Sequence, residues 1–281
     1  MAELTGKTAK AAGRVVTRLA MAALCLALVA AGKPTAPAKP GQPAQNAGME
    51  VKADVALLVD QATGAVLFEK NADKPFPPAS LTKMMTMSVA FREIKEGRLS
   101  LEQEYPVSEY AWRTGGAPSH TSSMFAPIHS NVKVIDLLQG VMIQSANDGA
   151  LVLAEGVAGS ASTFVEKMNA RAKELGMEAT SFANPTGLPD PGNRTTARDL
   201  IRLADDLIVG YPDLYKIYAQ AEFTYNKIRQ FNRNPLLRAF PGADGIKTGY
   251  IKESGYNLVG SAVQSGQRLI VVIGGAANEK D

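Results

Sequence analysis

Cysteine is almost absent from this chain. Its 281 residues include one, Cys25, which lies inside an apolar run near the amino terminus. Residues 32–281 therefore contain no thiol, which excludes disulfides, a cysteine nucleophile and thiolate metal ligands from that part. Histidine is nearly as scarce, and neither His120 nor His129 has a partner at a spacing typical of a zinc site. The sequence predicts no metal and no cofactor.

An excess of basic residues is also missing from most of the chain. The formal net charge is +3, of which residues 1–48 contribute +5, so residues 49–281 carry −2. A surface that binds nucleic acid needs a local excess of lysine and arginine to neutralise phosphates. The composition therefore argues against a nucleic-acid partner.

No apolar run is long enough for a typical membrane-spanning helix, which needs about 20 residues. The run at residues 19–31 has 13 residues, follows a basic segment and ends in small residues. This pattern predicts a secretory signal peptide over residues 1–31, cleaved after Ala31. Residues 32–48 are rich in proline, alanine and glutamine and are expected to form a disordered linker. We expect an exported protein of the bacterial periplasm or cell envelope.

The remaining residues, 49–281, read as one domain with strands at both ends and helices between them. Strand-like runs occupy 55–59 and 65–68, then 245–251, 256–263 and 268–273. Helical patterns dominate 134–209, with a capping box at Thr163–Glu166 and a further helix start at Thr196. The pattern predicts an α/β (α+β) fold: one antiparallel sheet from both chain ends, flanked by helices, with an inserted all-α subdomain at about 100–210.

Ser80 and Lys83 stand at the predicted start of a helix. Two prolines precede Ser80, and no glycine or proline follows until Gly97, so Ser80 is expected near the first turn of an apolar, buried helix. Side chains at i and i+3 share a helix face with Cβ atoms about 5–6 Å apart, so the Lys83 amine can reach the Ser80 hydroxyl. The spacing makes Ser80 a candidate nucleophile and Lys83 its candidate base.

Two further motifs follow in order, at Ser145–Asn147 and at Lys247–Gly249. With Ser80–Lys83 they resemble the S-x-x-K, S-x-N and K-T-G set of penicillin-binding serine peptidases. Longer stretches are similar to the low-molecular-mass D-alanyl-D-alanine carboxypeptidases, and the similarity covers about 50–278. These stretches are 79–86, 144–148, 182–188, 195–199, 244–250 and 254–259.

The resemblance implies a β-lactamase/transpeptidase-like fold and a role for each motif residue. In that family Lys83 is the base for Ser80, Asn147 binds the substrate amide and Ser145 relays a proton toward the leaving amine. The implied partners are peptidoglycan peptide stems, with β-lactam antibiotics as covalent inhibitors. The substrate-binding positions would be Lys247, Thr248 and Gly249 on the docking strand, Tyr250 with Ser80 as backbone donors of the oxyanion hole, and Arg198 at the terminal carboxylate.

Two features depart from the family pattern. Tyr250 stands where several relatives have histidine, so their pH dependence does not transfer to this chain. The sequence also stops at Asp281, just past the last predicted strand, whereas relatives continue with a helix packed on the sheet. Many relatives then add a β-rich domain and an amphipathic membrane anchor. Either the sequence is truncated at its carboxyl terminus or the fold is completed differently. Truncation would allow peripheral membrane association through a part absent here.

Three alternatives share the same residues. A β-lactamase needs rapid deacylation, which class A enzymes achieve with a glutamate, and no Glu-x-x-Leu-Asn pattern lies between Asn147 and Lys247. A D,D-endopeptidase cuts peptidoglycan cross-links with the same motifs and stays open. A catalytically silent peptidoglycan-binding protein is disfavoured because Ser80, Lys83, Asn147 and Lys247 are all present.

Overall fold

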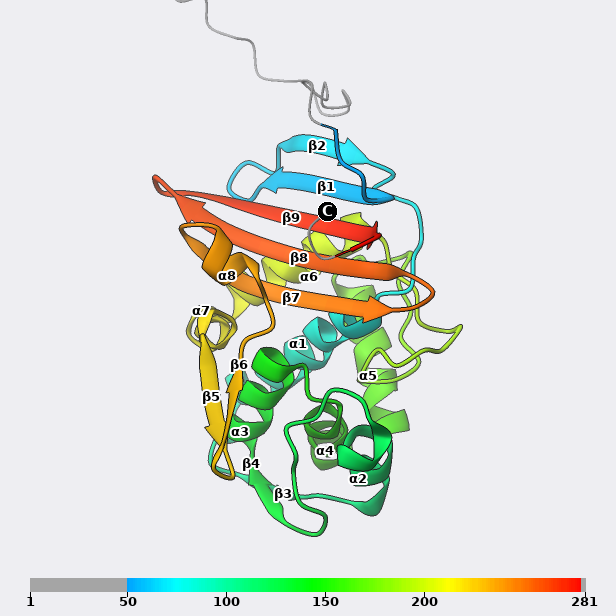
Figure 1. The fold of residues 1–281 in the computed structure, drawn as a ribbon, viewed down its shortest axis with the longest axis vertical. Helices are drawn as coiled ribbons and strands as arrows, with labels where there is room; N and C mark the ends of the chain where they lie inside the picture. Colours follow the sequence, from blue (N-terminus) through cyan, green and yellow to red (C-terminus); the bar gives the residue numbers. More distant parts are fainter. Residues whose placement is uncertain (1–49, 279–281) are drawn as a thin grey trace, which may run out of the picture. The chain divides into compact units, whose positions relative to one another are not determined.

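A five-stranded sheet is the largest element of the computed structural model, which describes residues 50–278. Every neighbouring pair of its strands is antiparallel, and the strand order is β2-β1-β9-β8-β7 (Figure 1). Antiparallel strands can be joined by short hairpins, as most of these are. The strands are β1 (Val55–Asp60), β2 (Val66–Lys70), β7 (Ala243–Ile251), β8 (Gly255–Gln264) and β9 (Gln267–Ala276).

The first and last strands of the described chain lie side by side. β1 pairs with β9 from Val55 opposite Gly274 to Asp60 opposite Leu269, and the blue and red strands are adjacent in Figure 1. The turn between β8 and β9 has positive φ at Ser265 (51°) and Gly266 (78°), as a tight hairpin requires. The prediction of one sheet built from both chain ends is confirmed.

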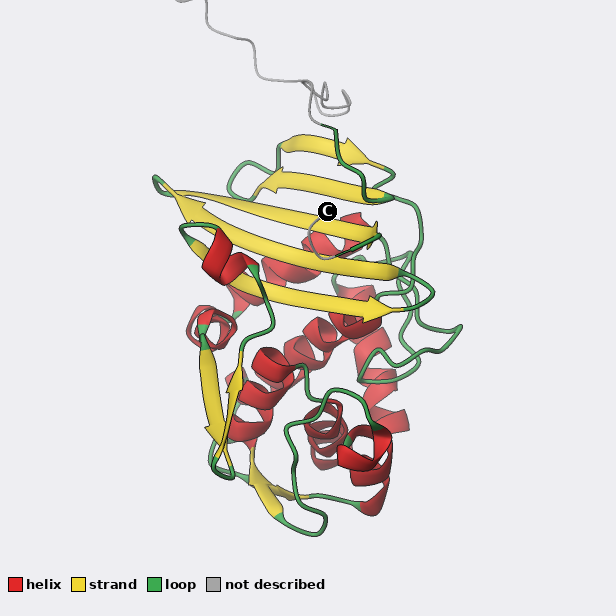
Figure 2. Ribbon diagram, viewed as in Figure 1, coloured by secondary structure: helices red, strands yellow, loops and turns green. Residues whose placement is uncertain are grey.

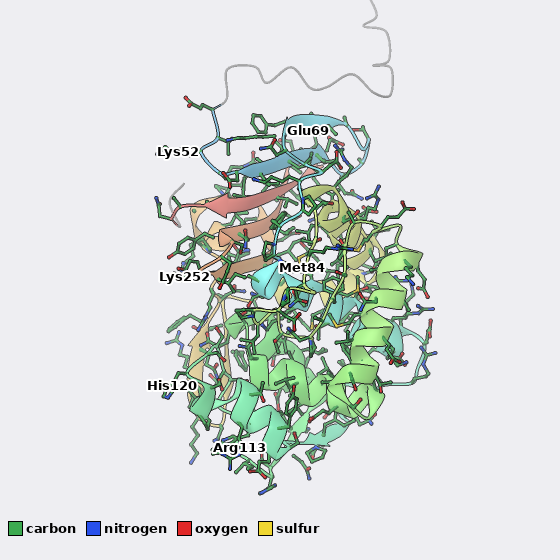
Figure 3. The ribbon with its side chains drawn as sticks, turned by 90° about the vertical axis from the view of Figure 1, so that its right-hand side faces the viewer. Lys52, Glu69, Met84, Arg113, His120 and Lys252 are labelled. Carbon is green, nitrogen blue, oxygen red and sulfur yellow. The ribbon has the colours of Figure 1, made fainter. Side chains whose placement is uncertain are left out.

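Helix α1 (Thr82–Lys95) is central and buried, as its apolar sequence predicts. All of its residues from Thr82 to Phe91 are buried, and Met84 lies in the interior in Figure 3. Helix α6 (Ala197–Gly210) contacts β1 and β9 and therefore covers one face of the sheet (Figure 2), and α1 packs against α6. Thr196 caps α6 by accepting a hydrogen bond from the Asp199 backbone N–H at 3.2 Å.

The inserted part is mainly helical, but it is not all-α as predicted. Two three-residue strands pair antiparallel within it, and segments this short are invisible to a periodicity argument. Moreover, α6 lies within the predicted range of the subdomain, but it packs on the sheet and so belongs with the sheet. The elements of this part are β3 (Glu104–Pro106), α2 (Glu109–Gly115), β4 (Asn131–Lys133), α3 (Val134–Gln139), α4 (Asn147–Ala158) and α5 (Ala161–Glu174).

Short elements connect α6 to β7, and three short turns lie next to the earlier helices. A two-stranded hairpin and two short helices bring the chain back to the sheet. These elements are α7 (Pro212–Tyr215), β5 (Glu222–Tyr225), β6 (Ile228–Phe231) and α8 (Leu236–Ala239), with 3₁₀ turns η1 (Ala79–Leu81), η2 (Ala117–Ser119) and η4 (Lys216–Ala219) and a π-helical turn η3 (Gly140–Gln144).

The predicted signal peptide (1–31) and linker (32–48) lie outside the described residues. Within residues 50–278, none of the helices combines the length and the apolar character needed to cross a bilayer.

The amino-terminal cap of α5 differs from the predicted capping box. The helix begins at Ala161, and Ser160 is the cap, because its side chain accepts a hydrogen bond from the Thr163 N–H at 3.1 Å. Thr163 therefore lies inside the first turn, where its hydroxyl contacts the Ser160 hydroxyl at 2.9 Å. Serine and threonine are both good capping residues, so the sequence offered Ser160 and Thr163 as candidates. The prediction of Thr163 as the cap was wrong.

We expect Ser160→Ala to lower the free energy of unfolding by about 0.5–2 kcal/mol, because the Thr163 N–H loses its acceptor. Thr163→Ala removes a hydroxyl that caps nothing and should cost less. Urea denaturation of both variants provides the comparison. A larger loss for Thr163→Ala than for Ser160→Ala would contradict the observed cap and restore the predicted one.

Candidate active site

Ser80 lies in the 3₁₀ turn that leads into α1, one turn ahead of the regular helix. Ala79, just before it, has a left-handed backbone with φ of 51°, which residues with a Cβ rarely adopt. Gly187 packs against this turn: a Cβ added there would lie 1.8 Å from the Ala79 carbonyl oxygen. The turn is thus held in a strained conformation by its neighbours, as is common at functional sites.

The Lys83 amine joins three segments that are far apart in the sequence. Its side chain is fully buried, and Nζ lies 3.2 Å from Ser80 Oγ and 2.6 Å from Asn147 Oδ1. It also donates a hydrogen bond to the backbone carbonyl of Thr186. The expected contact between the Lys83 amine and the Ser80 hydroxyl is present. The role of the Thr186 carbonyl was not predicted, because a backbone carbonyl carries no residue-type information.

The pKa of Lys83 is well below its ordinary value. Burial is the main cause, the positive charges of Lys247 and Arg233 act in the same direction, and the Asp148 carboxylate opposes them. Burial also lowers the pKa of Lys247 to about 7, with Arg233 as the second cause. Among the described residues, neither amine hydrogen-bonds to a carboxylate. Both lysines are therefore poised to lose a proton far below pH 10.

Ser145 and Asn147 are placed by an irregular end of a helix. The π-helical turn η3 ends at Ser145, which has a left-handed backbone with φ of 62°, and α4 starts two residues later at Asn147. Such π turns frequently occur at functional sites. Ser145 is 4% exposed, and its Oγ has no hydrogen-bond partner within residues 50–278. A buried hydroxyl left free in this way is available to a ligand or a water molecule.

A fully buried carboxylate, Asp148, organises the loop beside Asn147. It accepts hydrogen bonds from the Ser123 hydroxyl and from the backbone N–H groups of Met124, Ala126 and Gly149. The preceding residues of this loop hold Asn147 in turn: Asn147 Nδ2 donates to Thr121 Oγ1 at 2.9 Å, and its N–H donates to the Ser122 carbonyl at 2.7 Å. The sequence analysis did not identify Thr121, Ser122 and Asp148 as parts of the site.

Strand β7 forms the opposite wall of the site. Gly249 lies so close to Ser80 that an added Cβ would be 3.1 Å from the Ser80 backbone nitrogen. Lys247 is buried on this strand and donates a hydrogen bond to the Thr248 carbonyl at 2.8 Å. Tyr250 follows with its side chain 55% exposed. The structure thus brings the K-T-G strand against the Ser80 turn.

A pocket of about 670 Å³ opens above these groups. Ser80 and Ser145 lie in its wall, whereas Lys83 and Lys247 are buried and do not line it. This volume suits an extended ligand of drug-like size. The pocket is lined by Ser80, Ser122, Ser145, Arg233, Pro235, Arg238, Thr248, Gly249, Tyr250, Tyr256, Asn257, Leu258, Ile273, Ala276 and Asn278.

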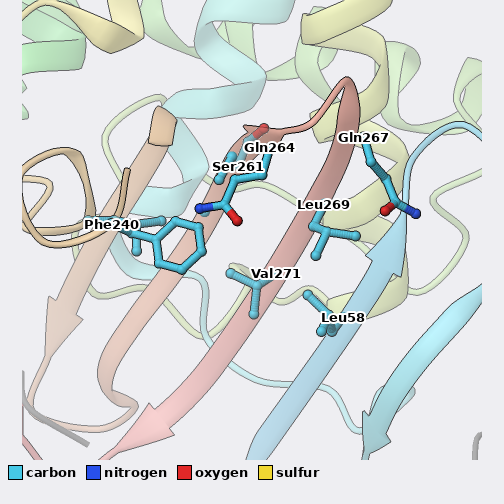
Figure 4. Close-up of a pocket in the computed structure, with 10 residues that line it drawn as sticks. Leu58, Phe240, Ser261, Gln264, Gln267, Leu269 and Val271 are labelled. Atoms are coloured by element: carbon cyan, nitrogen blue, oxygen red, sulfur yellow. The ribbon is translucent and has the colours of Figure 1, made fainter. Parts of the chain in front are cut away.

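A second cavity, of about 380 Å³, lies on the sheet face that α8 partly covers (Figure 4). Its lining is mainly apolar and includes Leu58, Phe240, Leu269 and Val271. It contains none of the nucleophilic or basic groups described above, so the Ser80 pocket is the candidate active site.

Arg198 does not lie in the Ser80 pocket. Its guanidinium pairs with Glu69 at 2.6 Å and Asp73 at 2.8 Å, and it is not among the pocket residues. A different arginine, Arg233, lines the pocket and donates a hydrogen bond to Ser122 Oγ at 2.7 Å. The chain has 30 lysines and arginines, and Arg233 belongs to none of the three motifs, so it could not be selected from the sequence.

His120 lies at the surface (Figure 3). Among the described residues, no group of three histidine, aspartate or glutamate side chains is arranged to hold a metal ion.

Comparison with known proteins identifies a family. The D-alanyl-D-alanine carboxypeptidase family matches residues 39–278. The chain belongs to this family. D-alanyl-D-alanine carboxypeptidase DacC of Escherichia coli is 45% identical over 226 residues, which cover 80% of this chain and 56% of that protein. The chain therefore spans little more than half the length of this relative.

Two further similarities concern function and structure. A D-alanyl-D-alanine endopeptidase of Pseudomonas aeruginosa is 32% identical over 84% of this chain and 74% of its own length. The crystal structure of penicillin-binding protein 5 from Haemophilus influenzae matches with a TM-score of 0.80 and 39% identity, covering 83% of this chain and 67% of that one. The predicted family and fold class are confirmed.

The lowered pKa of Lys247 predicts a pH-dependent stability. Folded protein loses this proton near pH 7, whereas the unfolded chain keeps it until about pH 10.4. Between these values the unfolded state binds more protons, so the free energy of unfolding should rise with pH by up to about 1.4 kcal/mol per unit. Lys247→Met removes this contribution.

Urea denaturation between pH 6 and 10 tests the effect. Wild type should gain stability relative to Lys247→Met above pH 7, while Lys227→Met, at an exposed position, should follow the wild-type slope. Parallel curves for wild type and Lys247→Met would show that Lys247 is not desolvated.

Proposed function

We propose that this chain is a serine-type D-alanyl-D-alanine carboxypeptidase. It removes the terminal D-alanine from peptidoglycan peptide stems through an acyl-enzyme on Ser80. The contact of Lys83 Nζ with both Ser80 Oγ (3.2 Å) and Asn147 Oδ1 (2.6 Å) carries this proposal, because it joins a nucleophile, a base and an amide in one pocket. Membership of the carboxypeptidase family supports it.

Acylation begins with neutral Lys83, which takes the proton of the Ser80 hydroxyl while Ser80 Oγ attacks the carbonyl carbon of the penultimate D-alanine. The backbone N–H groups of Ser80 and Tyr250 hold the oxyanion as it forms. Ser145, whose Oγ is free of other partners in the described chain, passes its proton to the nitrogen of the departing D-alanine and takes the proton held by Lys83, so Lys83 is neutral again. The peptide bond breaks, and an ester to Ser80 remains.

Deacylation uses the same groups. A water molecule gives a proton to Lys83 and attacks the ester carbon. The bond to Ser80 Oγ then breaks, Lys83 passes that proton to Ser80 Oγ, and the shortened peptide leaves as a carboxylic acid. Asn147 stays fixed throughout by its bonds to Thr121 and Ser122 and orients the substrate amide. β-Lactams would acylate Ser80 in the same way, because their strained amide resembles the substrate bond. The similarity to a penicillin-binding protein supports this inhibitor class.

The terminal carboxylate of the substrate is assigned to Thr248, Lys247 and Arg233. Thr248 and Arg233 line the pocket, and the buried Lys247 donates a hydrogen bond to the Thr248 carbonyl. Arg233 replaces the predicted Arg198, which is neutralised by Glu69 and Asp73 outside the pocket. Substrate of this kind is found outside the cytoplasmic membrane, so we propose export to the periplasm or cell envelope, in accord with the signal-peptide pattern.

A D,D-endopeptidase is the second candidate. It uses the same chemistry on the peptide bond of a cross-link, and the 32% identity to an endopeptidase favours keeping it in view. The two activities differ in the leaving amine. A carboxypeptidase releases a D-alanine that carries the free terminal carboxylate, whereas an endopeptidase releases the second peptide of the cross-link.

Purified protein should release D-alanine from a pentapeptide ending in D-Ala-D-Ala faster than it cleaves a cross-linked peptide dimer. Lys83→Ala should lower release by at least about 10³-fold, since general base catalysis contributes about 10²–10⁴-fold and an unactivated serine is a poor nucleophile. Circular dichroism checks that the variant is folded. Cleavage of the dimer without release of D-alanine would favour the endopeptidase.

Arg233 and Arg198 form a matched pair for testing carboxylate recognition. Charge-assisted hydrogen bonds contribute about 1.5–3 kcal/mol, so Arg233→Ala should lower kcat/KM for the peptide acid by about 10- to 100-fold. The same peptide with a carboxyl-terminal amide should lose much less. Arg198→Ala should leave the acid-to-amide ratio unchanged, and the reverse result would return the role to Arg198.

A further inference from the structure

The Ser80 pocket continues past the nucleophile, over strand β7 and onto the outer face of the sheet. Tyr250 and Tyr256 are opposite each other in the β7–β8 register, Thr248 is opposite Leu258, and Leu258 is opposite Ile273 on β9. All five residues line the pocket. Residues two apart on a strand share a face, so these side chains form one continuous surface beyond the motif residues.

Two tyrosine rings form the end of this surface. The ring centroids of Tyr250 and Tyr256 are 4.5 Å apart with planes at 40°, so each ring fixes the orientation of the other. Tyr250 is 55% exposed although it belongs to the active-site strand β7. A large aromatic side chain held rigid and exposed at the edge of a pocket loses little entropy when a ligand packs on it.

The charges of the site set the direction in which a peptide lies. β7 is the edge strand of the sheet, so a peptide can pair with it as an added strand. The terminal carboxylate belongs near Lys247 and Arg233, and Lys247 precedes Tyr250 on β7. The residues on the acyl side of the scissile bond therefore run toward Tyr250 and the end of β7, antiparallel to it.

We propose that Tyr250 and Tyr256, with Leu258 beside them, form a subsite for an apolar or aromatic side chain carried by the acyl group. This inference rests on the proposed function, because it uses the orientation of a substrate acylating Ser80. The pair would select among peptides and β-lactams by the side chain next to the reacting carbonyl. The three motifs do not encode this preference, since Tyr256 lies outside them.

Two β-lactams test the subsite. Benzylpenicillin and 6-aminopenicillanic acid have the same bicyclic nucleus and carboxylate, and they differ in the phenylacetyl group on the acyl side. We expect Tyr256→Ala to lower the ratio of their second-order acylation rates, benzylpenicillin over 6-aminopenicillanic acid, by about 5- to 10-fold. Tyr256→Phe retains the ring and should retain the ratio.

Tyr110→Ala is the matched control, because Tyr110 is 53% exposed on α2 and does not line the pocket. If Tyr256→Ala is not folded, the same ratio of acylation rates can be measured for Tyr250→Ala. This substitution keeps the backbone N–H that is assigned to the oxyanion hole. An unchanged ratio, with both compounds acylating the protein, would overturn the subsite alone. A wild-type protein that neither compound acylates would contradict the proposed function and the subsite with it.

Discussion

A lysine amine buried without a carboxylate partner is the constraint on which this site depends. Lys83 Nζ is surrounded by neutral oxygens from Ser80, Asn147 and Thr186, and the charges that lower its pKa are the cations of Lys247 and Arg233. Water would solvate an ammonium ion far better than this cavity does. The fold therefore favours the neutral amine, which is the form able to accept a proton.

The rest of the domain holds Lys83 and its neighbours in place despite the energetic cost of burying the amine. The sheet joins both ends of the described chain, so the K-T-G strand meets the Ser80 turn, and Gly249 allows the close approach. Gly187 packs directly against the strained Ala79, where a residue with a Cβ would not fit. On the other side, three hydrogen bonds from Ser123, Met124 and Ala126 to Asp148 fix the loop that orients Asn147. Rigid surroundings of this kind are what a preorganised site needs.

The sequence predicted what depends on side-chain type and period. The paired chain ends, the buried α1 and the Ser80–Lys83 contact all follow from apolar patterns and helical spacing. It could not predict what depends on tertiary contact alone. Thr186 contributes a backbone carbonyl, Arg233 reaches the pocket from an irregular loop, and Arg198 is drawn away by Glu69 and Asp73. Choosing between two arginines requires the positions of their partners, which no local pattern contains.

The pKa of Lys83 tests the central claim most directly. Nitrogen-15 NMR of lysine-labelled protein, with Lys83→Arg used to assign the Lys83 resonance, gives the midpoint of its titration. We expect a midpoint well below the ordinary value of about 10.4, rising when Arg233→Gln removes a neighbouring positive charge. A midpoint near 10.4 in wild type would mean that Lys83 is a charged residue at neutral pH, and the base would have to be sought elsewhere.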